Sequence, residues 1–549
     1  STTSGTVQGA GAFGATNGTF NYTGGSFAPA AATLSNLTAN FTSAMTLGTD
    51  GPDDLTLTTV NLTAPNGLTN PDTFAQTFTS VTSSSPIVNN GTLTMTGTST
   101  LDALTTGTTS SMSVTGSLTF ASGFTNNGAM TMGSSGSRVT VTTGAFTNSA
   151  TGTLTAPAIN GGIAYITGDF TNAGTVGGIG YWRLDGTASV VDNQGTWTLN
   201  STNQSLITNS ETFTNSGTID ITAGSFQVTH TGTGTSTTSG TVQGAGAFGA
   251  TNGTFNYTGG SFAPAAATLS NLTANFTPAT TLGTNGPDDL IMVNTNLTAT
   301  SLTNPVGLTQ SQWQGVTINN AVTNSGTLNF TASSILSTLT TDANSVINLN
   351  GTVSLADGFT NAGQFNMSSS SNLDVGGAVF VNTGTLTTTT GSHTITGDAR
   401  NDGTFDLSGT LFVSGAIGSA SVSAGIFTTP IPTGVELRSA GLNLDNATFD
   451  GVRLTSIGGT LTAVDNVTFQ NMNAALTQFT LTHPGNPTQI TFSELNFLTP
   501  PSGGLYTAIT DSDGSTPDTL DIIILSTTPG DGSAQSSVSG GAFVSWGAE

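Results

Sequence analysis

The sequence contains no cysteine and no lysine. Without cysteine the chain can form no disulfide scaffold, no thiol nucleophile and no zinc–thiolate site. Its cations are five arginines against 29 acidic residues, and the formal net charge is −24. Because phosphate binding requires clustered Lys and Arg, this balance argues against nucleic acid and anionic membrane surfaces as partners.

Charged residues and long apolar runs are also scarce. Only 6% of the residues are charged, and no apolar run approaches the ~18 residues needed to span a bilayer. Disorder usually combines high charge with low hydrophobicity, whereas 35% of this chain is hydrophobic and its apolar residues alternate regularly. We therefore expect a folded chain without a membrane span. The absence of cysteine fits a secreted protein, extracellular or at a cell surface, that relies on side-chain ladders in place of disulfides.

A Phe-Thr-Asn phrase recurs between residues 124 and 222. Its Phe and Asn residues are Phe124 and Asn126, Phe146 and Asn148, Phe170 and Asn172, and Phe213 and Asn215, while Asn193 fills the slot between the last two. Successive Asn residues are 22, 24, 21 and 22 positions apart. Such a period predicts a solenoid, in which each repeat is one turn that cannot bury its apolar face alone.

The residues after each Asn indicate the kind of turn. Asn-x-Gly precedes alternating stretches such as Thr196-Trp197-Thr198-Leu199, and this period of two is typical of a strand with one buried face. We expect the Asn-x-Gly corner to use positive φ, which Asn and Gly tolerate. We also expect the Phe residues to point inward and equivalent residues to form ladders in a parallel β-helix.

The chain also repeats on a larger scale. Residues 1–42 recur without a change at 236–277, and the Phe-Thr-Asn register returns at Phe359 and Asn361, then as Phe380 and Asn382. The repeats predict three segments, 1–235, 236–430 and 431–549. Because Ser1 falls inside a repeat, we expect the sequence to be a mature or trimmed form, with further copies once upstream.

These Phe-Thr-Asn-x-Gly and Asn-x-Gly-Thr turns resemble those of large bacterial surface and secreted β-helix proteins. Such proteins include autotransporter passengers, filamentous-haemagglutinin-type adhesins and related fibre proteins. Near the C-terminus, residues 444–449 return as 464–469, and these turns resemble pectin-lyase-like coils. The resemblance implies an all-β fold, a right-handed parallel β-helix with coils of about 19–25 residues. Since an open end exposes unpaired main-chain groups, we expect a C-terminal β cap within 485–549.

Two segments carry candidate ligand-binding residues. Asp511, Asp513 and Asp518 resemble part of a calcium loop, because alternating oxygen ligands suit Ca²⁺; the alternative is an ordinary acidic turn. Tyr181-Trp182-Arg183-Leu184-Asp185 is the one place where aromatic, cationic and acidic residues meet. It is either a sugar-stacking site or an aromatic-filled coil with a surface Arg–Asp pair. No other cofactor is expected.

No catalytic constellation is evident, since the three histidines are far apart and the arginines are scattered. We therefore expect a protein that is not an enzyme. The favoured function is a structural subunit of an extracellular fibre or surface layer, whose partner is itself through head-to-tail contact. One alternative is an adhesin or carbohydrate-binding stalk that contacts cell-surface glycans through the irregular segments 43–85 and 278–320. A polysaccharide-degrading enzyme is a further alternative.

Overall fold

The computed structural model describes residues 1–418, 425–428, 436–458, 461–483, 490–512, 521–526, 536–539 and 542–548. These residues form the predicted all-β parallel solenoid, with about 23 turns in all. The chain makes two compact units. Unit 1 comprises Ser1–Pro278 and Gly283–Asp288, and unit 2 comprises Ala279–Leu282 and Asp289–Glu549. The boundaries predicted from sequence repetition stay a prediction.

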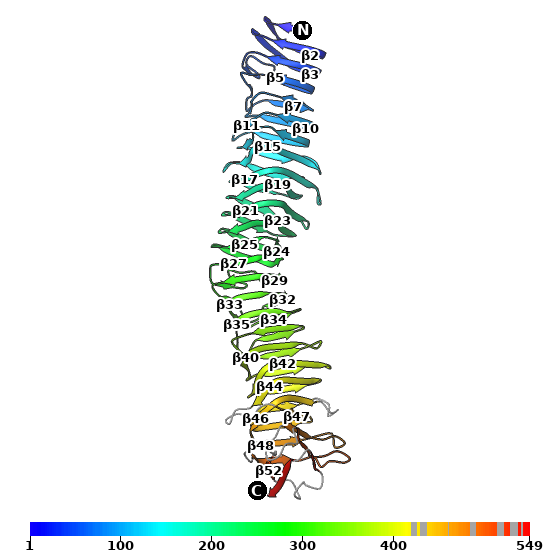
Figure 1. Cartoon of the computed structure of the whole chain (residues 1–549). Coiled ribbons are helices and arrows are strands. Elements are labelled where there is room, and N and C mark those ends of the chain that lie inside the picture. Colours follow the sequence, from blue (N-terminus) through cyan, green and yellow to red (C-terminus); the bar gives the residue numbers. More distant parts are fainter. Residues whose placement is uncertain are drawn as a thin grey trace. The chain divides into compact units, whose positions relative to one another are not determined.

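Unit 1 stacks each strand in parallel on the strand one turn earlier. One column contains β13 (Phe124–Asn126), β15 (Ser137–Asn148), β17 (Ile163–Asn172), β19 (Tyr181–Asn193), β21 (Gln204–Asn215) and β23 (Ser225–Thr238). A second column contains β14 (Ala129–Met132), β16 (Thr153–Ala156), β18 (Thr175–Gly178), β20 (Thr196–Leu199) and β22 (Thr218–Ile221). Figure 1 shows the layers of unit 1 following one another from β2 (Thr6–Tyr22) to β27 (Thr273–Phe276).

Alternation along the strands fills the core of the solenoid, as the sequence predicts. In β20 the side chains of Trp197 and Leu199 are buried, whereas Thr196 and Thr198 face outward. In β22, Ile219 and Ile221 are buried in the same way. Because equivalent residues are in register between turns, each inward side chain packs on its counterparts above and below. The apolar stabilisation of a turn therefore depends on its neighbours.

The corner glycines have a different role from the one expected. Gly174, Gly195 and Gly217 do not adopt positive φ. A methyl group at Gly195 would overlap the carbonyl oxygen of Gly174, and one at Gly217 would overlap that of Gly195. Glycine is needed here because the corners of successive turns approach too closely for a side chain. The prediction of a left-handed backbone at these glycines was wrong.

Unit 2 repeats this architecture. β38 (Phe359–Asn361), β40 (Asn372–Asn382) and β42 (Ser392–Asn401) stack in parallel, with Asn361 opposite Asn382 and Asn382 opposite Asn401. β46 (Glu436–Asp450) pairs with β48 (Leu461–Gln470) in the register that the 20-residue repeat predicts, Phe449 lying opposite Phe469.

The described residues near the C-terminus continue the same parallel stacking. β52 (Asp521–Ser526) pairs with β50 (Ile490–Phe497) on one side and with β54 (Phe543–Ala548) on the other. β52 is thus one further layer of the solenoid. The C-terminal cap stays a prediction, as does the right-handed sense of the helix.

Candidate functional site

The repeated Asn residues form a buried ladder of side-chain amides in unit 1. Each Nδ2 donates to the Oδ1 of the next Asn along the stack. The donor–acceptor distances are 2.9 Å from Asn126 to Asn148, 2.8 Å from Asn148 to Asn172, 2.7 Å from Asn172 to Asn193 and 2.7 Å from Asn193 to Asn215. These amides are buried, and a buried amide that loses its partner costs about 1–3 kcal/mol. The ladder therefore holds successive turns in one register.

The same arrangement is present in unit 2. Asn361 donates to Asn382 at 2.7 Å, and Asn382 donates to Asn401 at 2.8 Å. In both units the amide also donates to the corner, as from Asn126 to the carbonyl oxygen of Gly128 at 2.9 Å. Asn126 and Asn361 thus each join their own corner to the next turn.

The Phe residues of the phrase form a buried aromatic column beside this ladder. Phe124 and Phe146 have ring centroids 4.9 Å apart, and Phe146 and Phe170 are separated by 5.3 Å. In unit 2 the rings of Phe359 and Phe380 are 5.7 Å apart. Phe213 is also buried and contacts Phe226 at a centroid distance of 5.7 Å. These side chains stabilise the stack and are inaccessible to a ligand.

The predicted calcium segment is only partly described. Asp511 is buried in β51 (Thr507–Asp511), opposite His483 on β49 (Phe479–His483). Asp513 and Asp518 lie outside the described residues. Within the described ranges, no group of three or more His, Asp or Glu side chains is placed to hold a metal ion.

The three histidines, His230, His393 and His483, are buried within the solenoid. His230 is buried and contacts the carbonyl oxygen of Ser210 through Nδ1 at 2.9 Å and Ser236 Oγ through Nε2 at 2.7 Å. Burial lowers the pKa of His230, and the hydrogen bond with the Ser210 carbonyl opposes this shift. His393 and His483 are buried as well. None of the three side chains is placed at the surface for proton transfer to a substrate.

A charged cluster lies on the outer face of unit 1, over β15, β17 and β19. Arg138 Nη1 lies 3.0 Å from Asp185 Oδ1 and donates to Thr167 Oγ1 at 2.6 Å. Its guanidinium carbon lies 4.3 Å from the centre of the Tyr165 ring, which is within cation–π range. About a third of Arg138 and a quarter of Asp185 are exposed (34% and 26%). Such a surface pair contributes little to stability.

Arg183 lies beside this cluster, on β19. In register it stands opposite Tyr165 of the preceding turn and Leu206 of the following turn. The other four arginines each contact a carboxylate. Among the described residues Arg183 has no such contact, and its Nε is buried without an acceptor. The surface pair expected between Arg183 and Asp185 is not formed, because Asp185 is paired with Arg138.

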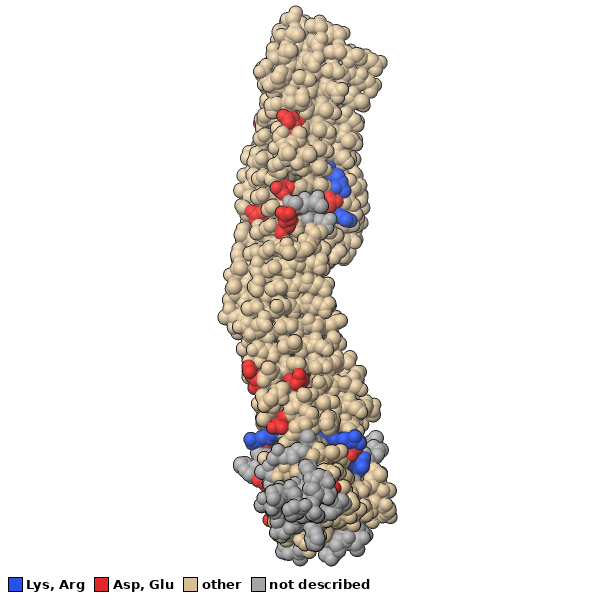
Figure 2. All heavy atoms as spheres, in the orientation of Figure 1, with Lys and Arg blue, Asp and Glu red and all other residues tan. Residues whose placement is uncertain are grey.

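A surface hollow of about 300 Å³ opens at Arg183. It is lined by Tyr181, Arg183, Asn203, Gln204 and Leu206. Trp182, the remaining aromatic residue of the predicted segment, is buried in the core, so only Tyr181 presents a ring here. Figure 2 shows blue and red atoms together at one level of unit 1, on a face that is otherwise largely uncharged.

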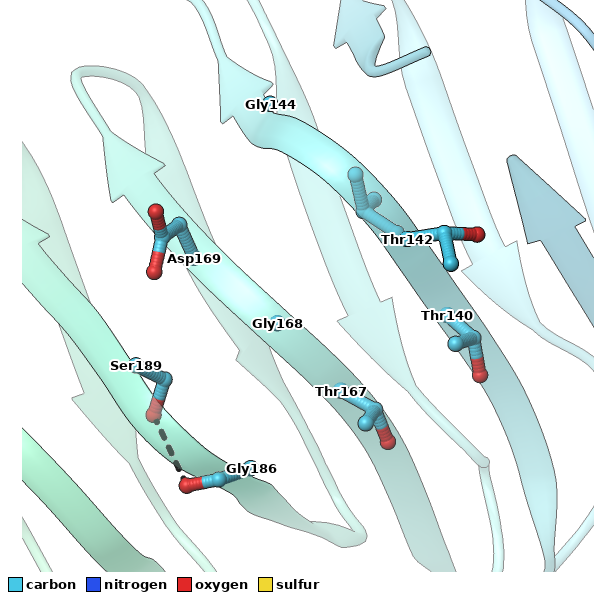
Figure 3. A pocket seen from close by; sticks show the side chains of 9 residues that line it. Thr140, Thr142, Gly144, Thr167, Gly168, Asp169, Gly186 and Ser189 are labelled. Atoms are coloured by element: carbon cyan, nitrogen blue, oxygen red, sulfur yellow. Dashed lines mark hydrogen bonds between the residues drawn. The ribbon is translucent and has the colours of Figure 1, made fainter. Parts of the chain in front are cut away.

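A second hollow of about 420 Å³ lies over β15, β17 and β19. Thr140, Thr142, Thr167, Asp169 and Ser189 line it, and Figure 3 shows their side chains on neighbouring strands. Asp169 Oδ1 accepts a hydrogen bond from the main-chain nitrogen of Val190 at 2.8 Å, and Ser189 Oγ donates to the Gly186 carbonyl at 3.3 Å. Both groups are thus engaged within the solenoid.

The prediction from the sequence included residues 181–185, which form part of this surface, but it did not include Arg138 and Tyr165. These residues belong to earlier turns, and Arg138 is 47 positions from Asp185. The repeat length could have indicated these residues, because two residues separated by about two repeats in the sequence lie two layers apart in the solenoid. The variable turn length hid the register that brings them together.

Comparisons of this chain with family models, with curated proteins and with solved structures gave no match. The architecture and the geometry of the side chains therefore carry the functional argument. They define the class of protein as a parallel β-solenoid. In the part of the chain that the structure describes, no helix is long and apolar enough to cross a membrane.

Proposed function

We propose that this chain is a non-catalytic structural subunit of an extracellular fibre or surface layer. The observation that carries the proposal is the buried amide ladder with its aromatic column, present in both units. The Asn side chains that recur in the sequence are hydrogen-bonded to one another from turn to turn. A repeat used in this way serves to extend and stiffen a scaffold, since the main interactions are between neighbouring turns.

The cysteine-free composition is compatible with an extracellular location. Hydroxyl and amide side chains supply most of the polar surface, and a stack of such groups avoids the repulsion that rows of like charges would cause. Cohesion between turns thus needs no disulfide. Within both units, the ladders join the turns that carry these Asn residues to their neighbours by hydrogen bonds.

The proposal includes head-to-tail contact between copies of the chain. The identical segments 1–42 and 236–277 support it, because the second segment shows that this sequence accepts a stacked turn on its N-terminal side. A heterologous contact that repeats without closing produces a filament.

Assembly is tested by light scattering and negative-stain microscopy over a range of protein concentrations. The proposal expects filaments or layers that lengthen with concentration. Protein that stays monomeric at the highest concentration, with no ordered assembly in the native material, would contradict it. Loss of assembly on substituting Phe13, without loss of the fold, would place the contact at the 1–42 segment.

A further inference from the structure

We propose that the hollow at Arg183 is a binding site for a saccharide that carries a carboxylate, such as a uronic acid unit of an acidic glycan. This inference goes beyond the structural function proposed above and does not depend on it. It rests on an unmatched cation, an aromatic ring and two amide side chains that the solenoid register places around one hollow.

Arg183 has no carboxylate partner among the described residues, unlike the other four arginines. The chain has 29 acidic residues and five arginines, so a carboxylate partner is readily available to any Arg. Asp185 is two positions from Arg183 on the same strand, but it is held by Arg138 and by a 2.6 Å hydrogen bond from Thr167 Oγ1. The cluster therefore keeps the nearest carboxylate away from Arg183 and leaves the Arg183 charge without a counterion among the described residues.

The chemistry of the guanidinium selects the ligand group. A guanidinium presents its N–H donors in a planar fork that matches the two oxygens of a carboxylate. Arg183 lines the hollow, and its Nε is buried without an acceptor in the described part of the chain. A carboxylate in the hollow would supply the missing acceptor and the missing charge.

The remaining lining residues indicate that the carboxylate belongs to a saccharide. Tyr181 offers an aromatic face, on which the C–H face of a sugar ring can pack, and a hydroxyl group. Asn203 donates through Nδ2 to Asn160 Oδ1 and to Ser201 Oγ, each at 3.1 Å. These bonds fix the amide, and its Oδ1 is left as an acceptor for a sugar hydroxyl. Gln204 is exposed beside it.

The size of the hollow fits this occupant. Its volume of about 300 Å³ is at the lower limit for small-molecule sites, so we expect one or two sugar rings of a longer chain to be bound. The second hollow is larger, but its Asp169 and Ser189 are already engaged. The Arg183 hollow differs from it because the Arg183 Nε is buried without an acceptor in the described part of the chain.

The experiment is isothermal titration of the full chain with trigalacturonic acid. Neutral galactotriose, acetate and a sulfated trisaccharide serve as comparison ligands. We expect trigalacturonic acid to bind more tightly than all three. Arg183→Gln should weaken its binding at least about tenfold, because a charged hydrogen bond is lost. Arg183→Lys should weaken binding less, since it keeps the charge but loses the fork. Tyr181→Ala should reduce the preference for the trisaccharide over acetate.

Arg400→Gln is the matched control, because it removes an exposed arginine that is paired with Asp402 at 2.7 Å. It should leave the affinity unchanged, and circular dichroism should show the same strand content in every variant. The proposal is overturned by any of four results: no binding of trigalacturonic acid, equal binding of galactotriose or acetate, tighter binding of the sulfated sugar, or unchanged affinity in folded Arg183→Gln.

Discussion

Residues 1–42 and 236–277 have the same sequence but differ in burial at their first turn. Val242, Phe248 and Ala250 are at most 1% exposed, whereas their counterparts Val7, Phe13 and Ala15 are only half-buried. From the second turn onward the difference disappears, since Phe27 and its counterpart Phe262 are both fully buried. Both segments lie in unit 1.

The cause is the preceding turn. β24 (Thr241–Thr251) pairs with β22 and β23 before it and with β26 (Ser261–Ser270) after it. β2 pairs with β3 (Ser26–Phe41) along its whole length. On its other side, the two-residue β1 (Thr2–Thr3) pairs only with the C-terminal end of β2. Identical residues thus reach different burial because the neighbouring turns supply much of each turn's core. Single substitutions at matched positions should therefore destabilise the two segments by different amounts.

The largest difference in the free energy of unfolding is expected between substitutions at Phe248 and at its counterpart Phe13. Phe248 packs against Phe226 of the preceding turn, with ring centroids 6.1 Å apart, in addition to Phe255 and Phe262. Among the described residues, the aromatic contacts of Phe13 are with the equivalents of the last two, Phe20 and Phe27. Phe248→Ala should lower the free energy of unfolding by about 4 kcal/mol, and Phe13→Ala by no more than about half of that. Urea titration measures both, and equal losses would contradict the account.

The matched glycines Gly5 and Gly240 should give a smaller difference in the free energy of unfolding. Neither Gly5 nor Gly240 adopts positive φ, and a methyl group at Gly5 would meet nothing. A methyl group at Gly240 would overlap the carbonyl oxygen of Gly217. Gly240→Ala should therefore cost about 2–3 kcal/mol, whereas Gly5→Ala should change the midpoint of unfolding very little. A destabilised Gly5→Ala protein would show that the effect is intrinsic to the sequence.

The smallest effect concerns pH. Ser236, the counterpart of Ser1, bonds to His230 of the preceding turn. Because burial holds the folded pKa of His230 below its ordinary value near 6.5, the folded state resists protonation. The associated stability is fully present above pH 6.5 and is lost as the pH falls from there toward the folded pKa. His230→Gln should flatten the dependence of the unfolding free energy on pH below 6.5. An unchanged slope would contradict this prediction.

The fold could be predicted from the sequence because its signals are local and periodic. The alternation in residues such as Trp197 and Leu199, and the regular return of Asn126, Asn148 and Asn172, depend on positions within one or two turns. The corner glycines show the limit of this approach. Their conformation does not require glycine, and the close approach that does require it is a property of two stacked turns.

The candidate site could be predicted only in part. Residues 181–185 lie on one strand, so their proximity follows from the sequence. The pairing of Arg138 with Asp185, which leaves Arg183 unmatched, spans 47 positions and depends on the register of three turns. Because the turn length varies, the sequence alone favoured the nearest Arg–Asp pair, which the structure does not contain.

Thiol labelling measures whether neighbouring turns bury the inward side chains of each turn. The chain has no cysteine, so Ala15→Cys, Ala250→Cys, Ala32→Cys and Ala267→Cys each introduce a single probe. Ala250, Ala32 and Ala267 are at most 1% exposed, and Ala15 is half-buried. In dilute monomeric protein, the account predicts fast labelling of the Ala15→Cys thiol and slow labelling of the other three. Equal protection at positions 15 and 250 would contradict it.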